Sequence, residues 1–426
     1  MQQMEERQQT VYKSGTILKK IHYMGALAMC AALILYMMSN NFIHEYIKKT
    51  SGIKGFTETT EARIYIGKEN TKRTTPSIKI IIHTYMRSGS SFTAELIAMH
   101  PNIFFVFEPF HCLDRIYKDG KVRIPYFPYL NRPARINPEN ISLVKYDIMN
   151  NYLLCEVFNI DLFTLQSPFL HLGNQRTGDY LQCLHESSNT KGVVSCLPIF
   201  QNACSRAKGI LIKTIRSEMS FYRKMMEKHQ SLKIIQLVRD PRATLFSMHK
   251  TGAINTDEWN NNLYNVAKIF CSRVLNDLEI ARELEALHPE RVKVVMYEDI
   301  AGDPIKKSFE LHKFVGIELL EEEKMKIIKK TSTGEVSCKD NMCTSKANST
   351  LAASAWRNRI PFISVQIIDQ ACGPLLYDIF GLNFIQSNQK LRSEHFSIRK
   401  PGGANFTKKH FIAENMRAKF KETRLI

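Results

Sequence analysis

Short apolar runs rich in β-branched residues alternate with stretches of helical spacing along the middle of the chain. The runs predict buried strands over residues 77–84, 103–107, 210–215, 232–238 and 292–297. Helical spacing predicts helices over residues 92–99, 242–249 and 262–287. Because strands alternate with helices, we expect an α/β protein whose mostly parallel sheet is flanked by helices.

The apolar pattern changes towards both ends of the chain. Residues 21–43 hold a nearly uninterrupted apolar run, and about 20 such residues cross a bilayer. We expect a cytosolic tail at residues 1–20, a transmembrane signal anchor at 21–43, a stem at 44–75, a single folded domain at 76–389 and a basic tail at 390–426. A cleaved signal peptide or a buried helix is the alternative for the apolar run, although the polar segment before it is long for a signal peptide. Within the folded domain, residues 112–208 are expected to form an irregular insertion.

The charge balance narrows the class of partner. The 426 residues include 59 Lys and Arg against 41 Asp and Glu, a formal net charge of +18. This charge favours nucleic acid, anionic membranes, or phosphorylated or sulfated molecules. The sequence has no zinc-finger spacing and no RNA-binding aromatic motif, so we expect no nucleic-acid partner. Ten cysteines without a CxxC pair and sequons at Asn140, Asn348 and Asn405, taken with the anchor, favour an oxidising lumen.

A small-residue turn joins the first predicted strand to the first predicted helix. Its residues are Arg87, Ser88, Gly89, Ser90, Ser91 and Phe92. Backbone N–H groups of such a turn and of a helix N-terminus bind anions, and an Arg adds a fixed positive charge. The turn therefore predicts a phosphate-like ligand, with an ordinary helix cap as the alternative. It is not a Walker A loop, because Gly89 is followed by Ser-Ser-Phe instead of Lys and a magnesium-binding hydroxyl.

A second candidate anion element follows the predicted strand at residues 232–238. Arg239 lies at the strand end, and Ser247 lies two turns into the next predicted helix. These two side chains could converge on a second phosphate, whereas the alternative is an Arg–Asp pair that caps the helix. No Cys/His or carboxylate spacing in the sequence suggests a metal site.

The two elements together resemble the Golgi carbohydrate 6-O-sulfotransferases. Further matching motifs, in order, are Glu108-Pro109, LVRDPRA, YEDIA at residues 297–301, FVG at residues 314–316 and Trp356-Arg357. The resemblance implies a P-loop-like α/β fold, 3′-phosphoadenosine 5′-phosphosulfate as donor, no metal and a type II Golgi anchor with a luminal catalytic domain. It also implies a glycan acceptor bearing galactose, N-acetylgalactosamine or N-acetylglucosamine, which the insertion could hold. The turn at residues 87–92 then resembles the family's 5′-phosphosulfate loop, and residues 239–247 resemble its 3′-phosphate element.

Sulfuryl transfer needs charge stabilisation on the leaving phosphate and a base for the attacking hydroxyl. Arg87 suits the first task. Glu108, at the end of the second predicted strand, is our candidate base, with His111 as second choice and a structural carboxylate paired with an Arg as the alternative. Lys213 and Arg216 could contact donor or acceptor, or could be plain surface charge.

Two other functions remain open at this point. A luminal glycosyltransferase usually carries a DxD metal motif, which the sequence does not contain. A membrane-anchored, non-catalytic glycan-binding protein would use only the basic surface.

Overall fold

A computed structural model of the chain describes residues 75–113, 126–128, 132–133, 138–187, 189–332 and 344–406. The predicted cytosolic tail and anchor, and all of the predicted stem except residue 75, lie outside the described residues. In the part of the chain that is described, no helix is both long and apolar enough to cross a membrane. All described residues fall in one compact unit, residues 73–426.

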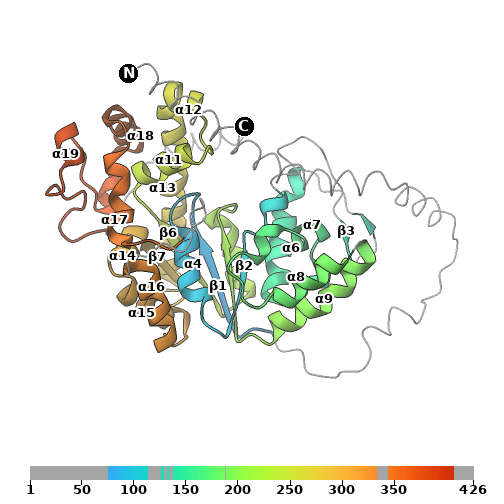
Figure 1. Ribbon diagram of the computed structural model, residues 1–426. Helices are drawn as coiled ribbons and strands as arrows, with labels where there is room; N and C mark the ends of the chain where they lie inside the picture. The colour runs from blue at the N-terminus through green and yellow to red at the C-terminus, as the bar shows by residue number, and fades with distance from the viewer. Residues whose placement is uncertain are drawn as a thin grey trace, which may run out of the picture. The chain divides into compact units, whose positions relative to one another are not determined.

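A five-stranded parallel sheet forms the centre of this unit, in the order β2-β5-β1-β6-β7 (Figure 1). The strands are β1 (Ile78–His83), β2 (Ile103–Phe107), β5 (Gly209–Thr214), β6 (Leu232–Val238) and β7 (Val292–Met296). The predicted α/β class and all five predicted strands are confirmed. Since parallel strands end at the same edge, the turns after β1, β5 and β6 lie side by side.

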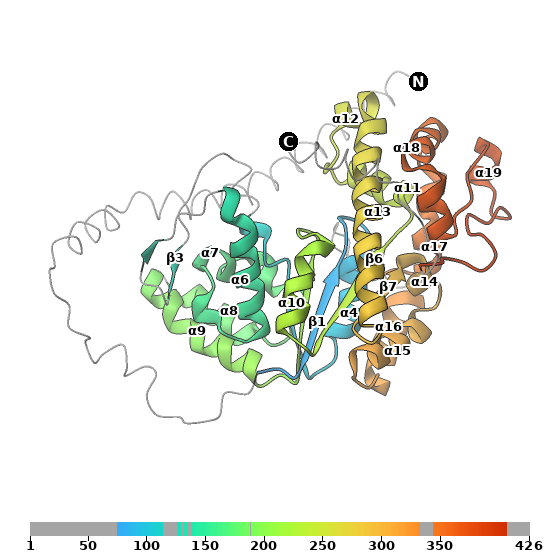
Figure 2. The ribbon, with the colours of Figure 1, turned by 180° about the vertical axis from the view of Figure 1, so that it is seen from behind.

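Helices cover both faces of the sheet (Figures 1 and 2). On β1, Ile80 and Ile82 belong to one apolar cluster and Ile81 belongs to another, as the alternation of a strand requires. The first cluster packs under α4 (Ser90–Ala98), α14 (Tyr297–Gly302), α15 (Pro304–Val315), α16 (Glu321–Ser332) and α17 (Ser349–Ser354). The second packs under α10 (Tyr222–Lys228) and the helices of the insertion.

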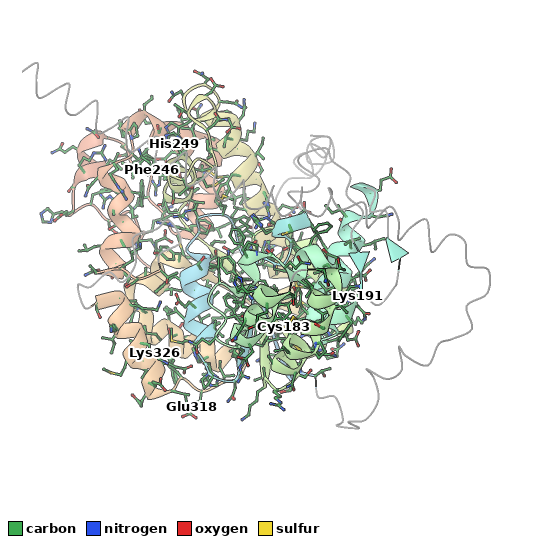
Figure 3. All side chains as sticks on the ribbon, turned by 45° about the vertical axis from the view of Figure 1, so that its right-hand side comes forward. Cys183, Lys191, Phe246, His249, Glu318 and Lys326 are labelled. Carbon is green, nitrogen blue, oxygen red and sulfur yellow. A yellow bond between two sulfur atoms is a disulfide. The ribbon has the colours of Figure 1, made fainter. Side chains whose placement is uncertain are left out.

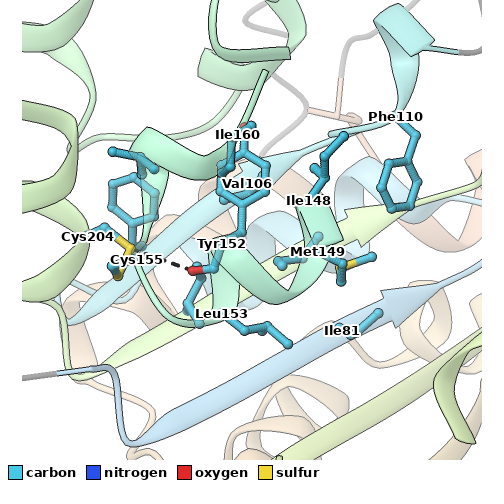
Figure 4. Close-up of a cluster of buried hydrophobic side chains, with 14 of the residues drawn as sticks. Ile81, Val106, Phe110, Ile148, Met149, Tyr152, Leu153, Cys155, Ile160 and Cys204 are labelled. Carbon is cyan, nitrogen blue, oxygen red and sulfur yellow. Dashed lines mark hydrogen bonds between the residues drawn. A yellow bond between two sulfur atoms is a disulfide. The ribbon is translucent and has the colours of Figure 1, made fainter. Parts of the chain in front are cut away.

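The prediction of an irregular insertion is wrong. This segment forms α6 (Ile141–Leu153), α7 (Leu162–Leu165), α8 (Gly178–Glu186) and α9 (Thr190–Ser205), with short 3-10 turns at Pro138–Asn140, Val157–Asn159 and Pro168–His171 and a small β3–β4 ladder (Tyr126–Phe127, Arg132–Pro133). Figure 4 shows the core between α6 and the sheet, where Tyr152 and Met149 lie over Ile81 and Val106. Long-range packing stabilises these helices, although their own sequence pattern is weak.

Among the described residues, three disulfides link segments that are distant in sequence. Cys155–Cys204 and Cys183–Cys196 lie within the insertion, and Cys271–Cys372 joins α13 (Leu263–Leu287) to α18 (Phe362–Phe380). In Figure 3, Cys183 and Lys191 mark the α8–α9 pair, whereas Phe246 and His249 mark α11 (Pro241–Lys250) on the other flank of the sheet.

A third apolar cluster lies between α11, α13 and α18. The remaining helices here are α12 (Thr256–Asn261) and α19 (Asn388–Arg392), with a 3-10 turn at Ala355–Asn358. Another 3-10 turn, Met219–Phe221, precedes α10 and packs in the cluster under the insertion. The first part of the predicted basic tail packs on this cluster through Phe396, Ile398 and Phe406, and Leu382 forms an isolated bridge with Arg399.

A buried ionic network stabilises this third cluster. Asp240 accepts a hydrogen bond from the Arg242 backbone N–H and so caps α11. The Arg242 guanidinium, fully buried, donates to Asp240 Oδ2 at 2.8 Å and to Asp369 Oδ1 at 3.5 Å. Asp369 also accepts from the hydroxyl of Tyr377 at 2.5 Å. Asp240 thus caps the helix as the alternative predicts, but the arginine that pairs with it is Arg242 and not Arg239 of the same motif.

We expect Arg242→Leu to destabilise the protein strongly, because it leaves Asp240 and Asp369 buried without their cation. Breaking such a pair costs about 3–5 kcal/mol of unfolding free energy. Arg223→Ala is the control, since its pair with Glu283 is half exposed and should contribute at most about 1 kcal/mol. Chemical denaturation measures both variants, and equal losses would contradict the assignment of stability to the buried network.

Candidate functional site

The turn after β1 has a geometry that only a few residue types adopt. Gly89, at the N-cap of α4, has φ 81°, and a Cβ there would lie 2.1 Å from the ring of Tyr297. Arg87 also has a positive φ of 63°. The first N–H groups of α4 have no partner within the helix, because of its geometry. The turn therefore presents amide donors at a helix N-terminus, as an anion site requires.

A buried polar network around Asp277 lies next to this turn, at the end of β1. Asp277 of α13 accepts from the Tyr85 hydroxyl at 2.9 Å and from the backbone N–H of Met219 at 2.8 Å, and it lies 3.2 Å from His83 Nε2. Burial alone would raise the pKa of Asp277, but His83, Met219 and Arg273 together hold it below its ordinary value. The carboxylate thus fixes the end of β1 from which the turn departs.

The two predicted anion elements meet. Arg87 Nε donates to Ser247 Oγ at 3.1 Å, and Arg239 Nη1 donates to the backbone oxygen of Arg87 at 2.9 Å. Burial and the charge of Arg239 lower the pKa of Arg87. The structure therefore brings Arg87, Arg239 and Ser247 together at the carboxyl edge of β1 and β6.

The start of α14 packs against both elements. The Arg239 guanidinium lies 4.6 Å from the ring centre of Tyr297, the same ring that contacts Gly89. Glu298 Oε1 accepts from the backbone N–H of Asp240 at 3.1 Å and lies 4.0 Å from Arg239 Nε. Burial raises the pKa of Glu298 to about 7. The charge of Arg239 and the hydrogen bond from the Asp240 N–H oppose this rise, whereas the charge of Asp240 adds to it.

Glu108 lies at the end of β2 with a positive φ of 50°. Its buried carboxylate accepts from Lys213 Nζ at 2.6 Å, from the backbone N–H of Ile215 at 3.4 Å and from Arg216. The alternative of a paired carboxylate is thus realised, while surface charge is wrong for Lys213, whose exposed fraction is 3%. The ring of His111 packs against Phe169, with 4.0 Å between the ring centres and an angle of 35° between the ring planes.

Lys213 connects the two halves of the site. Its β5 position pairs with Ile82 of β1 on one side and with Phe107 of β2 on the other. Burial lowers the pKa of Lys213, Arg216 and Arg87 lower it further, and Glu108 opposes them. The cations Arg239, Arg87 and Lys213 therefore form a row along this edge of the sheet, and Glu108 lies at its end, beside Lys213. Such a row suits a ligand with more than one anionic group. Among the described residues, no group of His, Cys, Asp and Glu could hold a metal ion.

Comparison with known families shows to which family this chain belongs. The family model described as "Sulfotransferase domain" matches residues 77–380. The chain belongs to the sulfotransferase family.

The similar curated proteins are named carbohydrate sulfotransferases. Mouse carbohydrate sulfotransferase 3 is 26% identical over 355 residues, which cover 76% of this chain and 72% of the relative. Mouse carbohydrate sulfotransferase 1 is 25% identical over 350 residues, covering 75% and 82%. Among solved structures, mouse sulfotransferase SULT7A1 complexed with PAP aligns with a TM-score of 0.37 and 15% identity, over 70% of this chain and 83% of that one.

These relatives confirm the resemblance to carbohydrate sulfotransferases drawn from the motifs. The protein is a sulfotransferase related to enzymes named for carbohydrate acceptors. Sequence reasoning had assigned no role to Tyr297 or Glu298. The available signal was their place directly after a buried strand, inside the YEDIA motif.

We expect Gly89→Ala in this sulfotransferase to abolish donor binding, because the new Cβ would collide with the Tyr297 ring. Gly252→Ala is a matched control: Gly252 has φ +78°, yet nothing lies within 4 Å of its Cβ position. The control should lose about 1 kcal/mol of stability from backbone strain and keep its activity. Equal behaviour of the two variants in thermal unfolding and nucleotide binding would show that strain alone matters.

Proposed function

We propose that the protein transfers a sulfuryl group from 3′-phosphoadenosine 5′-phosphosulfate to a hydroxyl, at the 6-position, of galactose, N-acetylgalactosamine or N-acetylglucosamine in a glycan. The convergence of Arg87, Arg239 and Ser247 supports this proposal most directly. It creates one basic site with two separate anion elements, as a nucleotide with phosphate groups at both ends of its ribose requires.

The turn and the N-terminus of α4 would hold the 5′-phosphosulfate of the donor. The residues proposed to bind it are Arg87, Ser88, Gly89, Ser90, Ser91 and Phe92. Arg239 and Ser247 would hold the 3′-phosphate. When bound, the donor supplies a sulfuryl group on a phosphate leaving group. Arg87 and the turn amides stabilise negative charge on that phosphate, because they are fixed in place before the reaction.

Glu108 is the proposed base. Its strand end lies beyond β5 from the phosphate turn, and Lys213 bridges the distance. In the described structure the Glu108 carboxylate is held by Lys213 and Arg216. An anionic donor near Arg87 would attract Lys213 and so release one carboxylate oxygen for the acceptor hydroxyl. His111, whose backbone N–H donates to Glu108 O, is the second candidate.

The names of the relatives support a carbohydrate acceptor. The resemblance of the motifs supports these three sugars and the 6-position. The insertion packs beside β2 through the turn Pro168–His171 and Phe107, on the same flank as Glu108. We infer that its helices form one wall of the acceptor site. Mass spectrometry of products from a panel of these three sugars, each with its 6-hydroxyl free or blocked, tests the sugar and the position together.

We further propose a single-pass type II protein of the Golgi membrane with a luminal catalytic domain. The apolar run at residues 21–43 and the three disulfides support it, because disulfides persist in oxidising compartments. Protease protection of the domain in sealed microsomes is the expected result, and cleavage without detergent would contradict it.

We expect Arg87→Ala and Arg239→Ala each to abolish release of adenosine 3′,5′-bisphosphate when donor and glycan are supplied. Each change removes a partly buried cation from the donor site, and losing a charged contact of this kind lowers kcat/KM by at least about 100-fold. Arg223→Ala, an exposed arginine, is the control. Unaltered turnover in either site variant would overturn the site assignment.

We expect Glu108→Gln to lower kcat by at least about 100-fold, the usual contribution of a general base, while the affinity for adenosine 3′,5′-bisphosphate stays within about twofold. His111→Gln should leave kcat much less affected. A single-turnover assay with prebound donor separates chemistry from binding. A large loss in His111→Gln and a small one in Glu108→Gln would transfer the role of base to His111.

A further inference from the structure

The Arg239 guanidinium is held on three sides by groups of the protein. The Tyr297 ring lies beneath it, the Arg87 carbonyl accepts from Nη1, and the Glu298 carboxylate lies beside Nε. These three contacts set the plane of the Arg239 guanidinium. Within the described residues, Nη2 makes no hydrogen bond, so this amino group remains available to a ligand.

Glu298 is unusual among these neighbours because it is a buried carboxylate in a donor site for an anion. Its side chain is 11% exposed and that of Arg239 is 12% exposed. Glu298 Oε2 and Arg239 Nε are both buried and have no hydrogen-bond partner among the described residues. Burying a charge is costly unless an opposite charge compensates it. Arg239 is the cation that faces Glu298, while Asp240 is the neighbouring anion.

We propose that Glu298 is a positioning residue: its carboxylate, anchored on the Asp240 N–H, orients Arg239 so that Nη2 faces the 3′-phosphate of the donor. The inference rests on the proposed donor site and adds to it a residue that does not itself touch the nucleotide. Glu298 would thereby set the preference of the site for nucleotides that carry a 3′-phosphate over those that do not.

Two nucleotides that differ only in the 3′-phosphate separate the role of Glu298 from that of the rest of the site. Adenosine 3′,5′-bisphosphate uses both anion elements, whereas adenosine 5′-monophosphate uses only the turn at residues 87–92. The affinity ratio, which is the dissociation constant of the monophosphate divided by that of the bisphosphate, therefore reports on the 3′-phosphate contact alone. Glu298→Gln keeps an oxygen that can accept from the Asp240 N–H and removes only the negative charge beside Arg239.

We expect Glu298→Gln to reduce this affinity ratio about tenfold, the effect of one charge-assisted contact. Affinity for the monophosphate should stay within about twofold, and the donor KM should rise while kcat at saturating donor is kept. Calorimetry at about pH 8.5, above the pKa of Glu298, keeps the wild-type carboxylate ionised. Asp299→Asn is the matched control, because Asp299 lies on the same turn but pairs with Arg399 at 3.0 Å and is 40% exposed.

Glu298→Asp withdraws the carboxylate by one methylene group and should give a ratio between those of the wild type and Glu298→Gln. This variant decides the matter if Glu298→Gln does not fold. An unchanged ratio, or equal weakening of both nucleotides, would overturn the positioning role while leaving the proposed function intact. Absence of binding of either nucleotide by the wild-type protein would instead overturn the donor site itself, and the inference with it.

Discussion

Two arginines of like charge are held against each other at the carboxyl edge of one parallel sheet, and the rest of the site depends on this arrangement. Arg87 and Arg239 repel, as the lowered pKa of Arg87 reflects. Two hydrogen bonds to neutral groups maintain their approach: the Arg239 guanidinium donates to the backbone carbonyl of Arg87, and the Arg87 guanidinium donates to the hydroxyl of Ser247. A site built in this way has its positive charge in place before an anion arrives, so little reorganisation is needed on binding.

Backbone strain accompanies the same arrangement. Among the described residues, Arg87, Glu108 and Cys155 are the non-glycine residues with positive φ, and the first two follow the site strands β1 and β2. Such conformations cost roughly 1–3 kcal/mol each and persist only where surrounding contacts determine them. Here the Asp277 network fixes the end of β1, while Lys213 and Arg216 fix Glu108. The strain therefore lies where side-chain direction matters for chemistry.

The sequence pattern predicted the sheet well and the insertion poorly, for physical reasons. Buried parallel strands such as residues 232–238 are apolar on both faces, so a short β-branched run identifies them. In α6 only the second half of the helix is buried, and α9 carries Pro198 in its interior. Their helical state depends on packing over the sheet and on disulfides, which local pattern does not report. The anion loops were predictable because each combines a strand end, a turn and a helix start.

The partners of Glu108 and Arg239 could not be predicted from spacing, because strand order decides them. β5 lies between β1 and β2, although it is more than 100 residues from either in sequence, and this order places Lys213 against Glu108. In the same way, β7 lies next to β6, so Tyr297 and Glu298 reach Arg239 from the following strand end. A motif read along the chain identifies which residues carry charge. The sheet decides which charges meet, and in this protein it pairs each site cation with a group that fixes its direction and leaves the row as a whole positive.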